Sequence, residues 1–325
     1  MGLGQAAAQV VRGEPPGGVG GDPPGLQLRG GLKGRAGVPG RGTVRQAGGM
    51  ADTLTLMAVH AHPDDEASST GGVLAHYAAE GVRTVVVTCT NGEFGDAPGG
   101  IKPGAEGHDE QEVAELRLAE LRQSAKLLGV TDLELLGYHD SGMAEWEYKD
   151  RPDAFSNVPL DVVAARIGGL IERYRPQVVV TYDPDGAYQH PDHVHASRSA
   201  IEAVTRTGIP AKLYLTAMPI SKWRELWAAL KESGADVPDA REFSPEMIQQ
   251  MEDAERRITT TVDIRPVLAR KQAALLAHAS QISESWLSQI PPEVGERVFG
   301  EESFVRVMDS TGAPLPEDDL FAGLR

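Results

Sequence analysis

The sequence predicts an α/β fold of three layers, Rossmann-like, in which a mostly parallel sheet lies between helices. From Leu54 onward, short apolar runs alternate with longer segments of helical periodicity. The runs LTLMAVH, VRTVVVTCT and QVVVTY are rich in valine and threonine. This composition is typical of parallel strands that are buried on both faces.

Each expected element follows from local signals. The first βα unit has a strand at 54–60 and a helix at 66–80, which Gly81 closes. A strand at 82–90 precedes a helix at 111–128, whose apolar residues share one face before Gly129 ends it. The other expected elements are strands at 133–138, 177–182, 212–217, 257–264 and 302–307, and helices at 160–174, 222–231 and 266–279.

The composition changes abruptly near Met50. Residues 1–49 contain sixteen glycines, no aromatic residue and a charge of +4, so that the rest of the chain carries −20. They lack both the apolar core of a secretory signal and the amphipathic helix of a transit peptide. We therefore expect residues 1–49 to be a disordered Gly/Pro/Arg-rich extension, with Met50 as an alternative start and residues 50–325 as one domain.

Charge and hydropathy exclude several classes of partner. The net charge of −16 and the lack of a basic stripe argue against binding to nucleic acid. No run approaches the roughly 20 apolar residues of a membrane-spanning helix. Cys89 is the only cysteine, so no intrachain disulfide can form, which fits a cytoplasmic protein. The expected partner is a small molecule.

Two of the loops that follow expected strands are rich in acids and histidines. HAHPDDE occupies residues 60–66 and DPDGAYQHPDHVH occupies residues 183–195. Ligands of open parallel sheets bind beyond the carboxyl ends of the strands, so the two loops are expected to share one crevice. Proline suits the first position of a helix, and we expect Pro63 and Pro191 to begin helices there.

Imidazole and carboxylate groups are the ligands of catalytic zinc, which uses three protein groups and leaves a position for water. His62, Asp65 and His193 supply such a set. Asp64 lies outside this set and is predicted to take a proton from the attacking water. Taken alone, the acids of HPDDE also suit a helix N-terminus, through the helix dipole. The pairing of the two loops favours the metal site.

Hydrolysis of an amide also requires a group that stabilises the oxyanion and one that protonates the leaving amine. His190 and Tyr188 precede His193 by about one helical turn and are the candidates for these two roles. Asp192 is expected to hold an imidazole in the correct tautomer. His60 is expected to be structural, whereas His278 lies in no motif.

The chain resembles the LmbE-like, or PIG-L, family of metal-dependent N-acetylglucosaminyl deacetylases, and it is similar to the branch that contains mycothiol-pathway enzymes. The resemblance covers about residues 54–220 and rests on HPDDE, NGEFGD at 91–96, RLAELRQSAKLLGV at 117–130, DSGM at 140–143 and TYDPDGAYQHPDH at 181–193. It implies zinc-dependent hydrolysis of the N-acetyl amide of an N-acetylglucosamine-type substrate, with iron as the alternative metal.

The resemblance also implies residue roles. It makes His62, Asp65 and His193 the zinc ligands and Asp64 the general base. It assigns protonation of the leaving amine to His190. Tyr188 would polarise the carbonyl oxygen or stabilise the oxyanion. Three further residues would face the sugar: Glu93, Arg117 and Asp140. Members of this branch commonly have glycine on both sides of the tyrosine, whereas this chain has Ala187 and Gln189.

Other functions are weaker interpretations of the same residues. A dinucleotide-binding oxidoreductase would need a glycine-rich first loop, which HPDDE replaces. A serine hydrolase built on Ser141 would need residues that converge from separate positions, and the chain has no GxSxG elbow. Two alternatives stay open: an amidase for thiol S-conjugates of a pseudodisaccharide, and a protein that binds metal or sugar without catalysis. A homo-oligomer is compatible with either.

Overall fold

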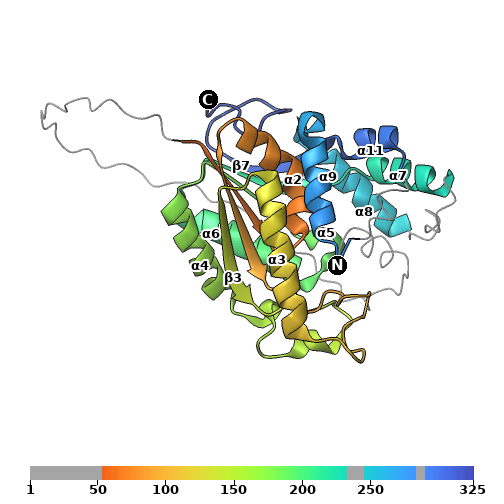
Figure 1. The fold of residues 1–325 in the computed structure, drawn as a ribbon. Helices are drawn as coiled ribbons and strands as arrows, with labels where there is room; N and C mark the ends of the chain where they lie inside the picture. Colours follow the sequence, from red (N-terminus) through yellow and green to blue (C-terminus); the bar gives the residue numbers. More distant parts are fainter. Residues whose placement is uncertain (1–52, 233–244, 283–289) are drawn as a thin grey trace, which may run out of the picture.

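The computed structural model describes residues 53–232, 245–282 and 290–325, which form a seven-stranded sheet with helices on both faces (Figure 1). The strands are β1 (Thr55–His60), β2 (Arg83–Thr90), β3 (Asp132–Tyr138), β4 (Val178–Thr181), β5 (Lys212–Ala217), β6 (Thr260–Asp263) and β7 (Glu301–Asp309). The extension predicted at residues 1–49 lies outside the described residues.

The spatial order of the strands is β3-β2-β1-β4-β5-β7-β6. The first five strands are parallel, and β7 runs antiparallel to its neighbours β5 and β6. The mostly parallel α/β sheet is therefore confirmed. Because β1 lies between β2 and β4, the chain crosses from one side of β1 to the other, and ligands bind at such a switch point.

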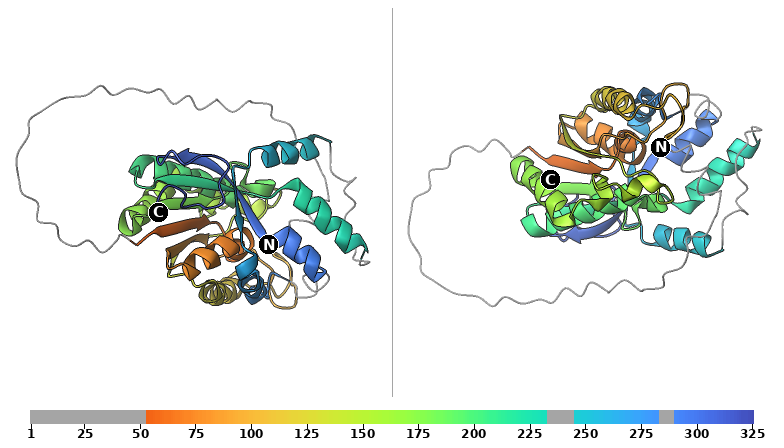
Figure 2. Two further views of the ribbon diagram at one scale, coloured as in Figure 1. Left: turned by 90° about the horizontal axis from the view of Figure 1, so that it is seen from above. Right: turned by 90° about the horizontal axis from the view of Figure 1, so that it is seen from below.

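Helices cover both faces of the sheet (Figure 2). One face carries α2 (Asp65–Ala79), α3 (Glu110–Leu128) and α9 (Leu268–Ala277), and the other carries α4 (Leu160–Tyr174) and α6 (Pro191–Thr207). Alternate residues of β1 serve the two layers. Leu56 and Ala58 pack with α2 and α9, and Met57 and Val59 pack with α4 and α6. Burial on both faces explains the continuous apolar runs.

Some elements differ from the sequence-based prediction. The prediction that Pro63 begins a helix is wrong: α2 begins at Asp65, because Asp64 adopts φ 113°, which is incompatible with a helix. Pro191 does occupy the first turn of α6. The helices α8 (Pro245–Arg256) and α11 (Pro292–Phe299) were not expected. The expected helix at 266–279 is divided into the 3₁₀ turn η4 (Arg265–Val267) and α9.

The remaining elements are short or peripheral. They are the 3₁₀ turns η1 (Glu147–Asp150) and η2 (Phe155–Asn157) and the helices α5 (Gly186–Gln189) and α7 (Ile220–Glu232). Apolar residues of α7 and α11 form a separate small cluster. Among the described residues, no helix is both long and apolar enough to cross a membrane.

Glu302 joins β7 to the α2–α9 layer. Its carboxylate accepts the backbone N–H groups of Gly72 and Val73 at 2.7 and 2.8 Å, and Lys271 Nζ donates to it at 2.7 Å. Replacing Glu302 by alanine would leave the buried ammonium of Lys271 and the N–H groups of Gly72 and Val73 without their hydrogen-bond acceptor. We predict a loss of about 3–5 kcal/mol in the free energy of unfolding, measured by urea denaturation.

The exposed pair between Glu202 and Arg206 on α6 is the matched control. Glu202→Ala is expected to cost about 0.5 kcal/mol or less, because solvent screens the pair. A cost for Glu302→Ala as small as that of the control would contradict a structural role for this buried carboxylate.

Candidate metal centre and active site

The loops after β1 and β4 bring three donor groups into contact. His62 Nδ1 lies 3.2 Å from His193 Nε2, and the two oxygens of Asp65 lie 3.4 Å from these two nitrogens. A tetrahedral zinc site with bonds of about 2.0–2.1 Å has ligand atoms roughly 3.3 Å apart. Each separation in this triangle is close to that value, with Asp65 presenting a different oxygen to each histidine, so His62, Asp65 and His193 are candidates to hold a metal.

The other ring nitrogens of both histidines have partners that orient them. Asp192 Oδ2 lies 3.1 Å from His62 Nε2, and the carbonyl oxygen of Gly186 lies 3.2 Å from His193 Nδ1. A proton on each of these nitrogens leaves a lone pair on His62 Nδ1 and His193 Nε2, directed at the shared space. The ring of Tyr182 stacks on His193 with centroids 4.3 Å apart. Both imidazoles are thus fixed with these two nitrogens facing each other.

Among the described residues, two combinations of three side chains bring one donor atom of each within 4.8 Å of one another: His62, His190 and His193, and His62, Asp140 and Asp192. The set that contains Asp65 differs from both, because its two contacts with the histidines use different oxygens of the carboxylate. In the first, His190 is already engaged as the cap of α6, because its Nδ1 accepts the N–H of Asp192 at 3.2 Å. In the second, both carboxylates already accept hydrogen bonds, Asp192 from Ser141 and Asp140 from the Gly142 N–H. Asp65 Oδ2 likewise accepts the His62 N–H at 2.7 Å, so the choice among the three sets needs a metal-binding experiment.

Burial and charge shift the titration of these groups in the metal-free protein. Burial lowers the pKa of His62, but the carboxylates of Asp140, Asp192 and Asp65 outweigh it and raise the pKa well above its usual range. Burial raises the pKa of Asp65, yet His193 and His62 hold it well below its usual range. Without a metal, the site therefore favours a protonated His62 beside ionised carboxylates.

Asp64 sits next to this cluster in a strained turn. Arg117, whose side chain is fully buried, donates from Nη2 to the Pro63 carbonyl at 2.8 Å and lies 3.2 Å from Asp64 Oδ2. Its Nη1 donates to the carbonyl of Gly92 at 2.7 Å. A side chain at position 92, where φ is 76°, would collide with the guanidinium. Gly92, the first glycine of NGEFGD, therefore lets Arg117 reach the HPDDE turn.

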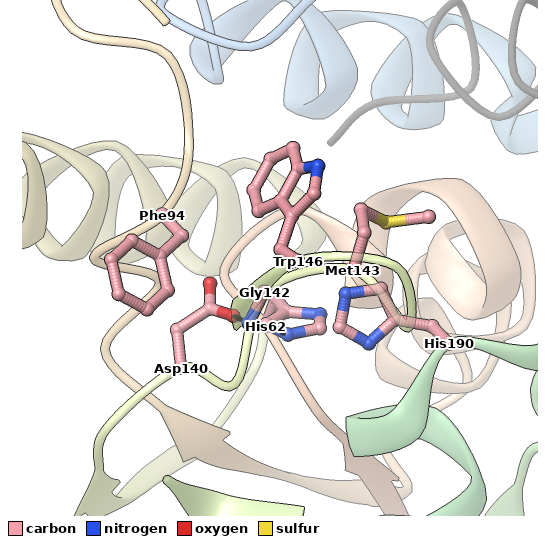
Figure 3. A pocket seen from close by; sticks show the side chains of 7 residues that line it. All are labelled: His62, Phe94, Asp140, Gly142, Met143, Trp146 and His190. Carbon is pink, nitrogen blue, oxygen red and sulfur yellow. Dashed lines mark hydrogen bonds and ion pairs between the residues drawn. The ribbon is translucent and has the colours of Figure 1, made fainter. Parts of the chain in front are cut away.

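A pocket opens beside the triangle (Figure 3). His62, Asp140 and His190 turn toward a common space, and Phe94, Gly142, Met143 and Trp146 complete its wall. The three apolar side chains were not predicted as site residues, although Phe94 lies in NGEFGD and Met143 in DSGM. Trp146 belongs to none of the motifs and could not have been assigned to the site from the sequence.

The structure places the predicted sugar-binding residues at different depths. Asp140 lines the pocket. Glu93 is buried behind it and accepts the Asp140 N–H at 2.9 Å. Arg117 does not line the pocket and contacts the HPDDE turn instead, so direct contact with a sugar is not supported by its position. The backbone of Tyr188 lies in α5, and its side chain is outside the described part of the structure.

The chain is similar to known proteins in sequence and in fold. A family model described as GlcNAc-PI de-N-acetylase, PIG-L, matches residues 57–204. The chain is 39% identical over 282 residues to a 1D-myo-inositol 2-acetamido-2-deoxy-alpha-D-glucopyranoside deacetylase of Acidothermus cellulolyticus, covering 83% of this chain and 95% of that protein. A protein of the same name from Salinispora arenicola is 39% identical over 295 residues, covering 85% and 94%.

Two solved structures share the fold. N,N'-diacetylchitobiose deacetylase from Pyrococcus horikoshii matches with a TM-score of 0.53 and 19% identity, covering 79% of this chain and 85% of that one. GalB, the 4-carboxy-2-hydroxymuconate hydratase from Pseudomonas putida, matches with a TM-score of 0.54 and 20% identity, covering 81% and 100%. Since one is a deacetylase and the other a hydratase, this fold is not tied to one reaction.

The donor triangle predicts which substitutions release the metal. Alanine at His62, Asp65 or His193 should lower the metal content of purified, dialysed protein from about one ion per chain to a small fraction, measured by elemental analysis. Asp64→Asn is the control and should retain the ion. If Asp64→Asn lost as much metal as Asp65→Ala, the roles of the two aspartates would be exchanged.

The raised pKa of His62 predicts that metal affinity depends on pH. A metal must displace the proton from His62, so affinity should rise with pH until His62 is neutral and fall by up to about tenfold per unit below its pKa. Competition titrations between about pH 6 and 8 measure this. Asp140→Asn should flatten the dependence, because it removes one carboxylate that raises this pKa. A wild-type affinity independent of pH would refute the explanation.

Proposed function

The chain belongs to the PIG-L family of GlcNAc-PI de-N-acetylases, and on this premise we propose that it removes the acetyl group from an N-acetylglucosamine-type substrate by zinc-dependent hydrolysis. The observation that carries the proposal is the donor triangle of His62, Asp65 and His193, of which His62 lines the pocket, with Asp64 next to Asp65 in the chain. Two imidazoles and a carboxylate form a ligand set of catalytic zinc.

When bound, zinc would act as a Lewis acid. It would lower the pKa of a water molecule and polarise the amide carbonyl. Asp64 is the proposed general base: as water adds to the carbonyl carbon, the carboxylate takes its proton. Arg117 holds that carboxylate and the Pro63 carbonyl, which fixes the direction from which Asp64 acts. Asp192 fixes the tautomer of His62 through its contact with Nε2.

His190 is the proposed proton donor to the nitrogen that leaves when the C–N bond breaks, with acetate and a free amine as products. Burial, together with His62 and His193, lowers the pKa of His190 well below its usual range. At neutral pH such a ring is mostly neutral, so the proposed role requires His190 to gain a proton before the C–N bond breaks. Tyr188 is proposed to stabilise the carbonyl oxygen as negative charge develops there.

The pocket wall suits a polar ring with one apolar face. Asp140 offers a carboxylate to hydroxyl groups, and Glu93 orients Asp140 through its backbone N–H. Phe94, Met143 and Trp146 offer apolar surface on which the C–H face of a pyranose can pack. We propose that the substrate is an N-acetylglucosaminide with an inositol or similar polar aglycone, as in the names of the two curated relatives.

A comparison of three substrates tests the proposal. The zinc-loaded enzyme should release acetate from N-acetylglucosaminyl-inositol with a higher kcat/KM than from free N-acetylglucosamine, because polar groups of the site stay unpaired with the smaller sugar. Asp140→Ala should reduce this preference, and Asp64→Asn should abolish most turnover with every substrate. Efficient cleavage of a bulky thiol S-conjugate with negligible acetate release would favour the amidase instead, and metal binding without any turnover would favour a binding protein.

A further inference from the structure

His278 is a buried histidine that the proposed mechanism does not use. It caps the C-terminal end of α9, on the same face of the sheet as α2 and α3 (Figure 1), and its side chain is fully buried. Its Nε2 lies 2.8 Å from Glu66 Oε1, 212 residues away along the chain. The segment that carries it lies beyond the residues that the family model matches.

Glu66, the last residue of HPDDE, is also fully buried and uses both oxygens. Oε1 accepts from His278 and from the hydroxyl of Ser124 on α3. Oε2 accepts the backbone N–H of Asp64 at 3.0 Å. An ionised carboxylate only accepts hydrogen bonds, so the proton in the contact with His278 lies on Nε2. His278 is therefore linked to the backbone of the proposed general base through one carboxylate.

The backbone of Asp64 needs such support. Its dihedral angles are φ 113° and ψ −25°, a conformation that a residue with a side chain rarely adopts and that persists only where its surroundings enforce it. Asp64 is the N-cap of α2, yet its side chain makes no capping bond to that helix and faces Arg117 instead. Arg117 holds the carboxylate of Asp64, and Glu66 holds its N–H.

We propose that His278 is a positioning residue for the hydrolysis: it fixes the Glu66 carboxylate, which in turn holds the Asp64 turn in its strained conformation. This inference rests on the proposed function only in that Asp64 is the general base. Removing His278 leaves Glu66 buried with one fewer donor, so Glu66 reorients and Asp64 loses its N–H acceptor. A misplacement of about 1 Å at a reacting group can slow turnover on the order of 100-fold.

The matched control is Leu275, a buried apolar residue of the same helix that makes no hydrogen bond to the site. His278→Ala is expected to lower kcat on the order of 10- to 100-fold, with KM and zinc content near those of the wild type. Leu275→Ala is expected to lower Tm without this loss of kcat. His278→Gln should recover most of kcat, because the glutamine amide nitrogen reaches the position of Nε2. Equal kcat in His278→Ala and Leu275→Ala, or no recovery in His278→Gln, would overturn the proposal.

Hydrogen exchange gives a readout that does not depend on turnover. The amide of Asp64 should exchange faster in His278→Ala than in Leu275→Ala, and His278→Gln should restore the protection. If His278→Ala does not fold, His278→Asn replaces it, because its shorter amide does not reach Glu66. Faster exchange without any acetate release by the wild type would refute the proposed function but support the positioning role. Acetate release by the wild type with the same exchange in all variants would refute the positioning role alone.

Discussion

Parallel pairing between β1 and β4 is the constraint on which the whole site depends. The pairing aligns Leu56 with Val178 and Ala58 with Val180, so both strands end at the same edge of the sheet. His62 and His193, which are 131 residues apart in the chain, consequently lie 3.2 Å from each other. Neither loop alone contains the donor triangle. The apolar sequence of the two strands is therefore as necessary to the chemistry as the histidines that follow them.

Burial then determines how the charged groups are arranged. A buried charge is costly unless it is paired, so each acid or cation around the triangle contacts a partner of suitable chemistry. Arg117 crosses from α3 to the HPDDE turn, Asp192 contacts His62, and Glu66 contacts His278. These contacts restrict the side chains to one arrangement before any ligand binds. Such restriction is what electrostatic stabilisation of a reaction requires.

The sequence predicted the order of the strands along the chain and the two loops of the site, because apolar runs and His-Pro-Asp motifs are local patterns. It did not predict that Arg117 is buried against the HPDDE turn, because a helix sequence does not show which of its charges is covered. Trp146 and His278 were also missed. His278 contacts Glu66 across 212 residues of the chain and lies in no motif, and Trp146 lies three residues beyond DSGM, outside the motif itself.

The most direct test of the donor triangle is anomalous diffraction at the zinc edge from crystals of the zinc-loaded protein. We expect one strong peak bounded by His62 Nδ1, His193 Nε2 and the Asp65 carboxylate. A peak between His62, His190 and His193, or between His62, Asp140 and Asp192, would contradict this assignment, since each of these two sets brings one donor atom of each residue within 4.8 Å of the others.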